Sequence, residues 1–151
     1  MQTIKISTHP EFKEQAAKWF SKNWDIPYQA YLESMQVAID HLNAVPEWYV
    51  MIDKNRNIVA GAGIIENDFH ERTDLTPNLC ALFVEEKYRN QHLAKQLLNF
   101  VKVDCATRGF EKLYLITDIT NFYEKCGWQF LIMVKTDEGE LMKMYESEIY
   151  I

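Results

Sequence analysis

The sequence predicts an α/β (α+β) fold in a single domain, and three observations support this. Apolar residues alternate between strand and helix periodicity, in the order strand, two helices, hairpin, strand, helix, strand, short helix and hairpin. The strands at residues 78–84 and 113–117 are joined by a helix, and such a crossover makes two strands parallel. The chain has 151 residues, 48% of them apolar, which is enough for one core. We therefore expect one domain over residues 1–151.

The first strand and the first helix occupy the N-terminal part of the chain. Residues 2–7 alternate in polarity as a strand does. Thr8 and Glu11 have the spacing of a capping box, which predicts a helix start at Thr8. Apolar side chains at i, i+4, i+7 and i+8 over residues 12–20 form one helical face. Pro27 ends this helix because it disfavours the helical conformation of the residue before it.

A second helix and a hairpin follow. Apolar residues at helical spacing predict a helix over residues 28–42, with Leu42 on its apolar stripe. Residues 48–53 and 58–66 are strand-like runs separated by the polar turn 54–57, which predicts a β-hairpin.

The middle of the chain alternates between loop, strand and helix. Residues 67–77 are polar and predict a surface loop long enough to shape the mouth of a substrate site. The strand at residues 78–84 leads to a helix from residue 93 to about residue 107, which Gly109 ends. Residues 113–117 form a buried strand.

The last elements are a short helix and a closing hairpin. The short helix runs through Tyr123 and ends near Gly127, and Asp118 is a candidate to cap its start. Residues 129–134 and 141–145 are predicted to pair as a hairpin.

Composition excludes several classes of function. A net charge of −6 argues against nucleic acid as the main partner, because phosphate binding needs a basic surface. An acidic surface attracts cationic substrates such as amines, although it also serves solubility alone. The three cysteines are Cys80, Cys105 and Cys126, without a CxxC pair, so we expect neither a disulfide framework nor a metal site. A reducing cytoplasm fits this usage, and no apolar run of about 18 residues predicts a membrane span.

The segment from Cys80 to Leu98 is the most informative. It predicts a strand, a very short turn and a helix whose first turn carries residues 89–94. The unpaired amides and the dipole of a helix start form a site for phosphate or pyrophosphate. The pattern Arg-x-x-(Gly)-x-Ala, from Arg89 to Ala94, resembles the pyrophosphate loop of the GCN5-related N-acetyltransferase (GNAT) family. His92 stands where the family usually has Gly.

A second motif strengthens the resemblance. Phe122-Tyr-Glu-Lys-Cys-Gly-Trp128 is similar to a family segment that follows the next strand, about 34 residues after the first motif. The resemblance covers roughly residues 59–145. It implies a GNAT-like mixed, mostly antiparallel central sheet with helices on both faces and a CoA cleft between two splayed parallel strands. Acetyl-CoA would be the cosubstrate, without a metal.

The resemblance also implies which residues contact the cofactor. Arg89 sets the turn, Asn121 reaches the pantetheine arm and Lys125 approaches the adenosine end. The backbone groups that pair with the pantetheine amides belong to Leu82, Phe83 and Val84. The amides that hold the pyrophosphate belong to Asn90, Gln91, His92, Leu93, Ala94 and Lys95.

Two residues are candidate catalysts. Tyr123 matches the tyrosine that the family commonly uses as general acid, and a phenol of reference pKa about 10 stays protonated until thiolate charge develops. The alternative interpretation is that Tyr123 is a packed aromatic residue before a glycine turn. Glu66, at the end of the hairpin, is a candidate base for the ammonium proton, and its alternative is a solvated loop carboxylate.

His92 and the aromatic residues of the first two helices leave alternatives open. A β-carbon at position 92 is tolerated if the residue has helical φ and ψ, which any residue adopts. Otherwise the cofactor site is weakened and the protein is a non-catalytic relative. Trp24, Tyr28 and Tyr31 lie in the region that usually covers the acceptor site, while the two tyrosines also suit a helix core.

The sequence therefore predicts an acetyl-CoA-dependent N-acetyltransferase that acts by direct attack of a primary amine. The acceptor is a small molecule or a peptide, with aminoglycoside, polyamine, amino acid and protein N-terminus all open. The alternative is a GNAT-fold CoA-binding or regulatory module without turnover. Neither nucleic acid nor membrane is an expected partner, and self-association into a homodimer stays open.

Overall fold

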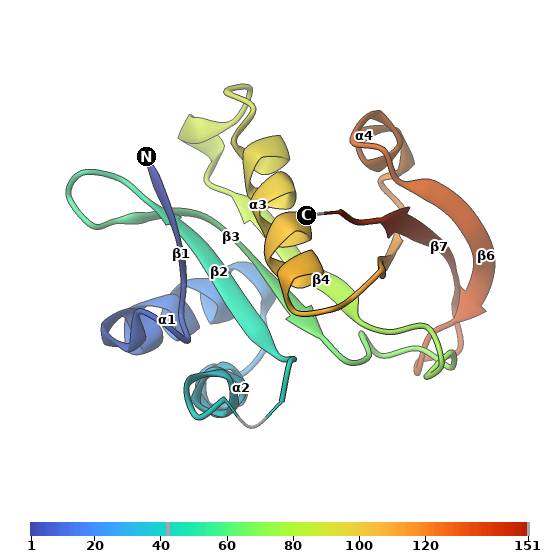
Figure 1. The fold of residues 1–151 in the computed structure, drawn as a ribbon, viewed down its shortest axis with the longest axis horizontal. Coiled ribbons are helices and arrows are strands. Elements are labelled where there is room, and N and C mark those ends of the chain that lie inside the picture. The colour runs from blue at the N-terminus through green and yellow to red at the C-terminus, as the bar shows by residue number, and fades with distance from the viewer. Residues whose placement is uncertain (42, 151) are drawn as a thin grey trace. The chain divides into compact units, whose positions relative to one another are not determined.

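The structure, a computed structural model, describes residues 1–41 and 43–150. The chain divides into two compact units (Figure 1). The N-terminal unit contains Met1–Ile64 and Ala81–Val101, and the C-terminal unit contains Ile65–Cys80 and Lys102–Ile151.

The elements follow the order expected from the sequence. The strands are β1 Gln2–Lys5, β2 Glu47–Ile52, β3 Ile58–Ile65, β4 Asn78–Val84, β5 Lys112–Thr117, β6 Gln129–Lys135 and β7 Leu141–Glu148. The α-helices are α1 Lys13–Trp24, α2 Tyr28–Ile39, α3 Leu93–Thr107 and α4 Thr120–Lys125, with short 3-10 helices at Pro10–Phe12 and Glu86–Tyr88.

The sheet is mixed and mostly antiparallel, as expected. Its seven strands have the order β1-β2-β3-β4-β5-β7-β6. Antiparallel pairs join β1 to β2, β2 to β3, β5 to β7 and β6 to β7. The pair β4 and β5 is parallel, with Asn78 opposite Tyr114, which confirms the crossover through α3.

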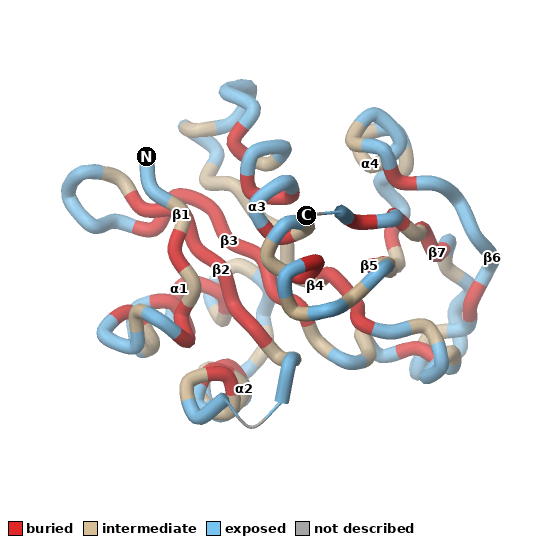
Figure 2. The backbone as a smooth tube through the Cα atoms, viewed as in Figure 1, coloured by how far each residue is buried: buried red, intermediate tan, exposed pale blue. Residues whose placement is uncertain are grey.

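In the N-terminal unit, helices pack on both faces of the sheet. Successive side chains of a strand point to opposite faces. The Trp48 ring lies 5.0 Å from the ring of Phe20 on α1 and 5.2 Å from that of Tyr31 on α2. The next residue, Tyr49, instead faces Phe100 of α3 at 6.0 Å. β2 and β3 are accordingly buried along most of their length (Figure 2).

Two glycines allow this close packing. A Cβ on Gly61 would lie 2.7 Å from the Phe20 ring and 2.8 Å from the Trp19 ring, and a Cβ on Gly63 would meet the Trp48 ring. Glycine at these two positions therefore lets helix α1 and the Trp48 ring approach the β3 backbone more closely than a residue with a Cβ would allow.

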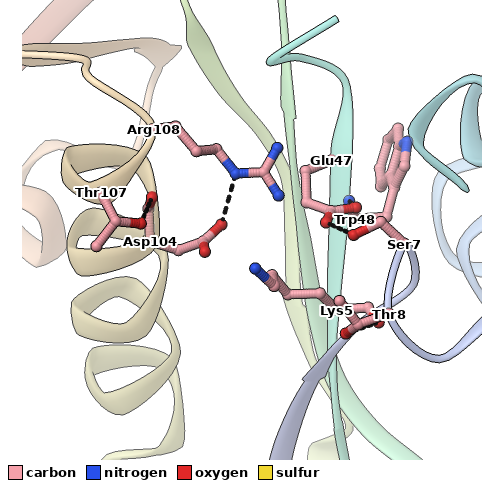
Figure 3. Close-up of polar contacts among 8 residues, drawn as sticks. All are labelled: Lys5, Ser7, Thr8, Glu47, Trp48, Asp104, Thr107 and Arg108. Atoms are coloured by element: carbon pink, nitrogen blue, oxygen red, sulfur yellow. Dashed lines mark hydrogen bonds and ion pairs between the residues drawn. The ribbon is translucent and has the colours of Figure 1, made fainter. Parts of the chain in front are cut away.

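Buried charge in the N-terminal unit is paired. Glu47 is fully buried at the start of β2. Its carboxylate accepts hydrogen bonds from the hydroxyl of Ser7 and, at 3.0 Å, from the amide of Trp48 (Figure 3). These partners offset the desolvation that an unpaired buried carboxylate would suffer.

In the C-terminal unit, β7 lies between β5 and β6, and Trp128 packs beneath α4. Trp128 is 2% exposed, and its ring is 6.1 Å from that of Tyr123. Lys102 donates a hydrogen bond of 3.1 Å to the Cys126 carbonyl, and its ammonium lies 5.1 Å from the Trp128 ring centre. At the end of α3, Arg108 pairs with Asp104 at 3.0 Å (Figure 3).

Two expected helix starts are wrong in detail. The Thr8 hydroxyl donates to the Lys5 carbonyl at 3.2 Å instead of capping a helix, and a 3-10 turn precedes the start of α1 at Lys13. The start of α4 is preceded by Ile119, whose amide bonds to the Thr117 hydroxyl at 2.8 Å. Ile119 is the N-cap residue of α4, and no side-chain bond caps this position, so the expected cap at Asp118 is wrong.

The second helix is shorter than expected. It ends at Ile39, after which Asp40 and His41 leave the helix, and His41 has a φ of 54°. Leu42, expected on its stripe, lies outside the described residues.

Two further findings concern membranes and metals. Among residues 1–41 and 43–150, no helix combines the length and apolarity needed to cross a bilayer. The same residues contain no group of three His, Cys, Asp or Glu side chains that could hold a metal ion.

Candidate functional site

The segment between β4 and α3 presents unpaired amides. The Gln96 amide donates to the His92 carbonyl at 3.1 Å, so His92 supplies the first helical acceptor. The amides of Leu93, Ala94 and Lys95 therefore lie in the first turn, where no helical carbonyl precedes them. These groups and the helix dipole suit a bound anion.

His92 is not in the helix, and this corrects the expectation of helical φ and ψ. Its φ is 62°, in the left-handed region, and that of Asn90 is 63°. Glycine adopts this region without steric cost, which explains physically why the family prefers it here. The sign of φ alternates over Asn90, Gln91 and His92, a pattern typical of backbone nests that bind anions. The loop adopts this form with His92 in place, and the side chain is exposed.

Arg89 fixes the turn from β4. Its Nε donates to the Val84 carbonyl at 2.9 Å, and its guanidinium lies 5.3 Å from the centre of the Phe83 ring. The Arg89 amide bonds to the Glu86 carbonyl at 3.2 Å. These contacts connect Arg89 to the end of β4, and they occupy the Val84 carbonyl.

Two tryptophans of α1 hold the end of β4. The Trp24 indole donates to the Ala81 carbonyl at 3.1 Å, and the Trp19 indole donates to the Glu85 carboxylate at 2.8 Å. The rings of Trp19 and Trp24 also make T-shaped contacts with the ring of Phe83. Sequence reasoning placed Trp24 only near an acceptor site and did not find this contact.

Ala81 interrupts the strand. Its φ is 55°, a left-handed value inside β4. Such a residue breaks a regular ladder and bends the strand. The sequence did not predict this bend, because Gly or Asn, and not Ala, is the usual residue in a left-handed conformation.

Tyr123 lies on α4 in the C-terminal unit and is half-buried. Its ring is 5.1 Å from that of Phe122, and its carbonyl accepts the Trp128 amide at 3.0 Å. Burial raises the pKa of the Tyr123 phenol well above its ordinary value, and the nearby Cys126, Cys80 and Asp68 raise it further. The phenol therefore stays protonated through the neutral range.

Asn121 and Lys125 are both exposed on α4. Their side chains are accessible to a ligand, as the proposed cofactor contacts require. Glu66 directly follows β3, and its side chain is exposed, while its carbonyl accepts from the Asn78 amide group at 3.2 Å.

The loop after β3 contains a buried polar pair that the sequence did not reveal. His70 is 2% exposed and Asn78 is fully buried, although residues 67–77 were expected to be a polar surface loop. The Arg72 amide donates to His70 Nδ1 at 3.2 Å, which leaves Nε2 to donate to Asn78 Oδ1 at 2.6 Å. Neutral His70 is thus held in one tautomer.

Asn78 links this pair to the rest of the loop. Its amide nitrogen also donates to the Leu75 carbonyl at 2.8 Å. Both polar atoms of its side chain therefore bind the segment from Glu66 to Leu75.

The tyrosines of α2 do not share one role. Tyr31 is 4% exposed, and its ring stacks on that of Phe20 at 5.5 Å. It is a core residue, as the helix-face interpretation predicted. Tyr28 is half-buried at the start of α2.

Comparison with known proteins identifies one family. A model of the acetyltransferase (GNAT) family matches residues 10–128. No curated protein matches the sequence.

Solved structures share the fold over almost the whole chain. An acetyltransferase of the GNAT family from Staphylococcus aureus Mu50 is 22% identical, with a TM-score of 0.68, over 99% of this chain and 100% of that one. An aminoglycoside 6'-N-acetyltransferase complexed with coenzyme A is 18% identical, with a TM-score of 0.72, over 100% and 98%. A spermidine N-acetyltransferase SpeG variant from Vibrio cholerae is 15% identical, with a TM-score of 0.66, over 98% and 95%.

Proposed function

Because the chain belongs to the acetyltransferase (GNAT) family, we propose that it transfers the acetyl group of acetyl-CoA to a primary amine of a small molecule or peptide. The observation that carries this proposal is the anion-binding loop at residues 89–95, with its left-handed residues and its open helix start. The left-handed residues and the free amides of a helix start support the binding of a pyrophosphate by this loop.

The cofactor contacts follow from this loop. The amides of Asn90, Gln91, His92, Leu93, Ala94 and Lys95 bind the pyrophosphate, and Arg89 keeps the loop in shape. Backbone groups of Leu82, Phe83 and Val84 bind the pantetheine arm, except for the Val84 carbonyl, which Arg89 already occupies. Asn121 and Lys125 bind the pantetheine arm and the adenosine end, and their exposure supports this.

Acetyl transfer proceeds by direct attack of the amine nitrogen on the thioester carbon. The C–S bond breaks, and Tyr123 gives its phenolic proton to the departing sulfur. Its raised pKa ensures that the proton is present at neutral pH. The proton of the incoming ammonium must also be removed, and the exposed Glu66 is the candidate base from the sequence. Fixed orientation of the two substrates supplies much of the acceleration.

The acceptor class has two supports. The net charge of −6 favours a cationic substrate over an anionic one. Structures that share the fold include enzymes named for aminoglycosides and for spermidine, both of which carry amines. The three free cysteines fit a reaction in the reducing cytoplasm.

The second candidate function is CoA binding without turnover. The His92 side chain at the pyrophosphate loop is the observation that favours it. A panel of amines, assayed with acetyl-CoA for release of free thiol, separates the two functions. Thiol release that depends on an amine supports the transferase, whereas tight CoA binding without any turnover supports the binding module.

A further inference from the structure

Helix α4, which carries Tyr123, has little packing of its own. It has six residues, Thr120–Lys125, and each of them is at least partly exposed. Its N-cap is Ile119, whose apolar side chain cannot accept a bond from the first helical amides. A helix this short is not stable alone. The position of α4, and of the Tyr123 ring with it, therefore depends on contacts from other elements of the C-terminal unit.

Two side chains from other elements bind the C-terminal end of α4. The buried Tyr145 of β7 donates its hydroxyl proton to the Glu124 carboxylate at 2.7 Å. Lys102 of α3 donates to the carbonyl of Cys126, the C-cap residue, at 3.1 Å. The last carbonyls of a helix carry the negative end of its dipole, so an ammonium is a favourable partner for them. Lys102 thus binds the end of α4 with a positive charge.

The same ammonium lies against the turn and the ring that follow α4. It is 5.1 Å from the centre of the Trp128 ring, which is a cation–π distance. Gly127 has a φ of 88°, the left-handed value of a residue that ends a helix. A Cβ on Gly127 would lie 3.9 Å from Lys102 Nζ. One ammonium therefore lies beside three successive residues, from Cys126 to Trp128.

Trp128 connects this ammonium to Tyr123. The Trp128 amide donates to the Tyr123 carbonyl at 3.0 Å, and the two rings meet edge to face at 6.1 Å. Trp128 is 2% exposed, so its ring has little room to move. An edge-to-face pair constrains the direction of each ring. A continuous series of contacts thus runs from Lys102 Nζ through Trp128 to the Tyr123 ring.

Holding a charge at this place has a cost. The Lys102 side chain is half-buried, and this burial lowers the pKa of its ammonium below 10.5, while Cys126 offsets part of the shift. Desolvation therefore opposes the charged form. A methionine is unbranched and apolar and would fill the same space without this cost. An ammonium here therefore suits a role beyond filling space.

We propose that Lys102 is a positioning residue for the acetyl transfer: its ammonium holds the turn after α4 and the Trp128 ring, and through them the direction of the Tyr123 phenol. This role rests on the proposed function, in which Tyr123 gives its proton to the departing sulfur. A general acid must be within hydrogen-bond reach of the group that it protonates. A misplacement of about 1 Å can cost about 10²-fold in rate. Lys102 acts only through Tyr123 and not on a reacting atom.

The first test compares the wild type with Lys102→Met and Lys102→Arg, using an amine that turns over. Lys102→Met removes the ammonium and should lower kcat by about 10–10²-fold, because the phenol is no longer held in one direction. KM for the amine and the Kd of CoA should stay within about threefold, less than the tenfold that corresponds to 1.4 kcal/mol. Lys102→Arg keeps a cation and hydrogen-bond donors and should retain most of the kcat.

A double-mutant cycle with Tyr123→Phe separates positioning from a general structural role. If Lys102 acts through the phenol, Lys102→Met should lower kcat by less than about twofold once the hydroxyl is absent. A structural defect would instead lower kcat equally in both backgrounds. Lys102→Gln is the second variant, since it lacks the charge but can still donate to the Cys126 carbonyl. It should show the same dependence on Tyr123.

Lys112→Met is the matched control in the same unit. Lys112 lies on β5, and its ammonium is 3.5 Å from the Glu146 carboxylate of β7. The change removes the same charge from a different pair and should leave kcat unchanged. The Tm of both methionine variants should lie within about 4 °C of the wild-type value, which shows that the fold is intact.

Four outcomes would overturn the assignment. An unchanged kcat in Lys102→Met would remove the positioning role and leave acetyl transfer standing. Equal losses of kcat with and without the Tyr123 hydroxyl would make Lys102 a structural residue only. An unchanged kcat in Tyr123→Phe would mean that there is no acid to position, although the transferase would stand. No turnover of any amine by the wild type would reject the proposed function, and with it this role.

Discussion

At the scale of single residues, His92 shows how a sequence departure can be accommodated. The family's glycine position has a φ of 62° here, so backbone conformation is the property that matters. The cost of a left-handed conformation for a residue with a Cβ is about 1–2 kcal/mol. The imidazole itself is exposed.

His92→Gly should therefore change the Kd of CoA by less than tenfold, or about 1.4 kcal/mol. The wild type already has the left-handed φ at residue 92, so glycine relieves strain without changing the path of the loop. Titration calorimetry measures the affinity. A gain well above tenfold would show that His92 impairs the native site and would favour the binding module without turnover.

Tyr123→Phe tests the proposed acid. The ring stays against Trp128, so stability should change little, while kcat should fall by about 10²–10⁴-fold and the Kd of CoA should hardly move. Because the pKa of the Tyr123 phenol is raised, the phenol keeps its proton up to pH 9. Loss of this proton should therefore not lower the wild-type kcat between pH 7 and pH 9. An unchanged kcat in the variant would make Tyr123 a packed aromatic.

At the scale of elements, the site depends on how closely α1 approaches the sheet. Gly61 lets the Phe20 and Trp19 rings reach the β3 backbone. Trp19 and Trp24 then bond to Glu85 and to the Ala81 carbonyl, which precede the loop at residues 89–95. Gly61 of β3 thus determines the position of α1, the helix that supports β4.

Gly61→Ala should destabilise the fold by about 1–3 kcal/mol, because the new methyl group overlaps two aromatic rings. Urea denaturation followed by tryptophan fluorescence measures the change. The double variant with Phe20→Leu is the control, since a smaller side chain makes room and should lessen the cost that the Gly61 change adds. Equal costs in both backgrounds would show that the overlap is not the cause.

At the scale of the whole molecule, the cofactor should stabilise the fold by mass action. At a CoA concentration about 100-fold above its Kd, the gain is roughly 2.7 kcal/mol if only folded protein binds. A thermal scan with and without CoA measures it, and adenosine without the pyrophosphate serves as the matched ligand. Absence of any upward shift with CoA would contradict both the transferase and the binding module.

The sequence by itself determined the order and type of the elements. Its periodicity gave the bounds of β4 and α3, which the structure matches at Asn78–Val84 and from Leu93. Local patterns suffice for this, because a helix or strand displays its buried face at a fixed spacing. The two family motifs added the family and its fold class for the same reason, since each is a contiguous string of residues.

Only the tertiary structure decided the backbone conformation of His92 and Ala81 and the burial of His70 and Asn78. None of these has a local signature. A left-handed alanine or histidine is held by surrounding bonds, such as that from Trp24 to the Ala81 carbonyl. A polar loop residue is buried only when a strand partner such as Asn78 closes over it. These features therefore depend on contacts between residues far apart in sequence, which spacing along one chain does not encode.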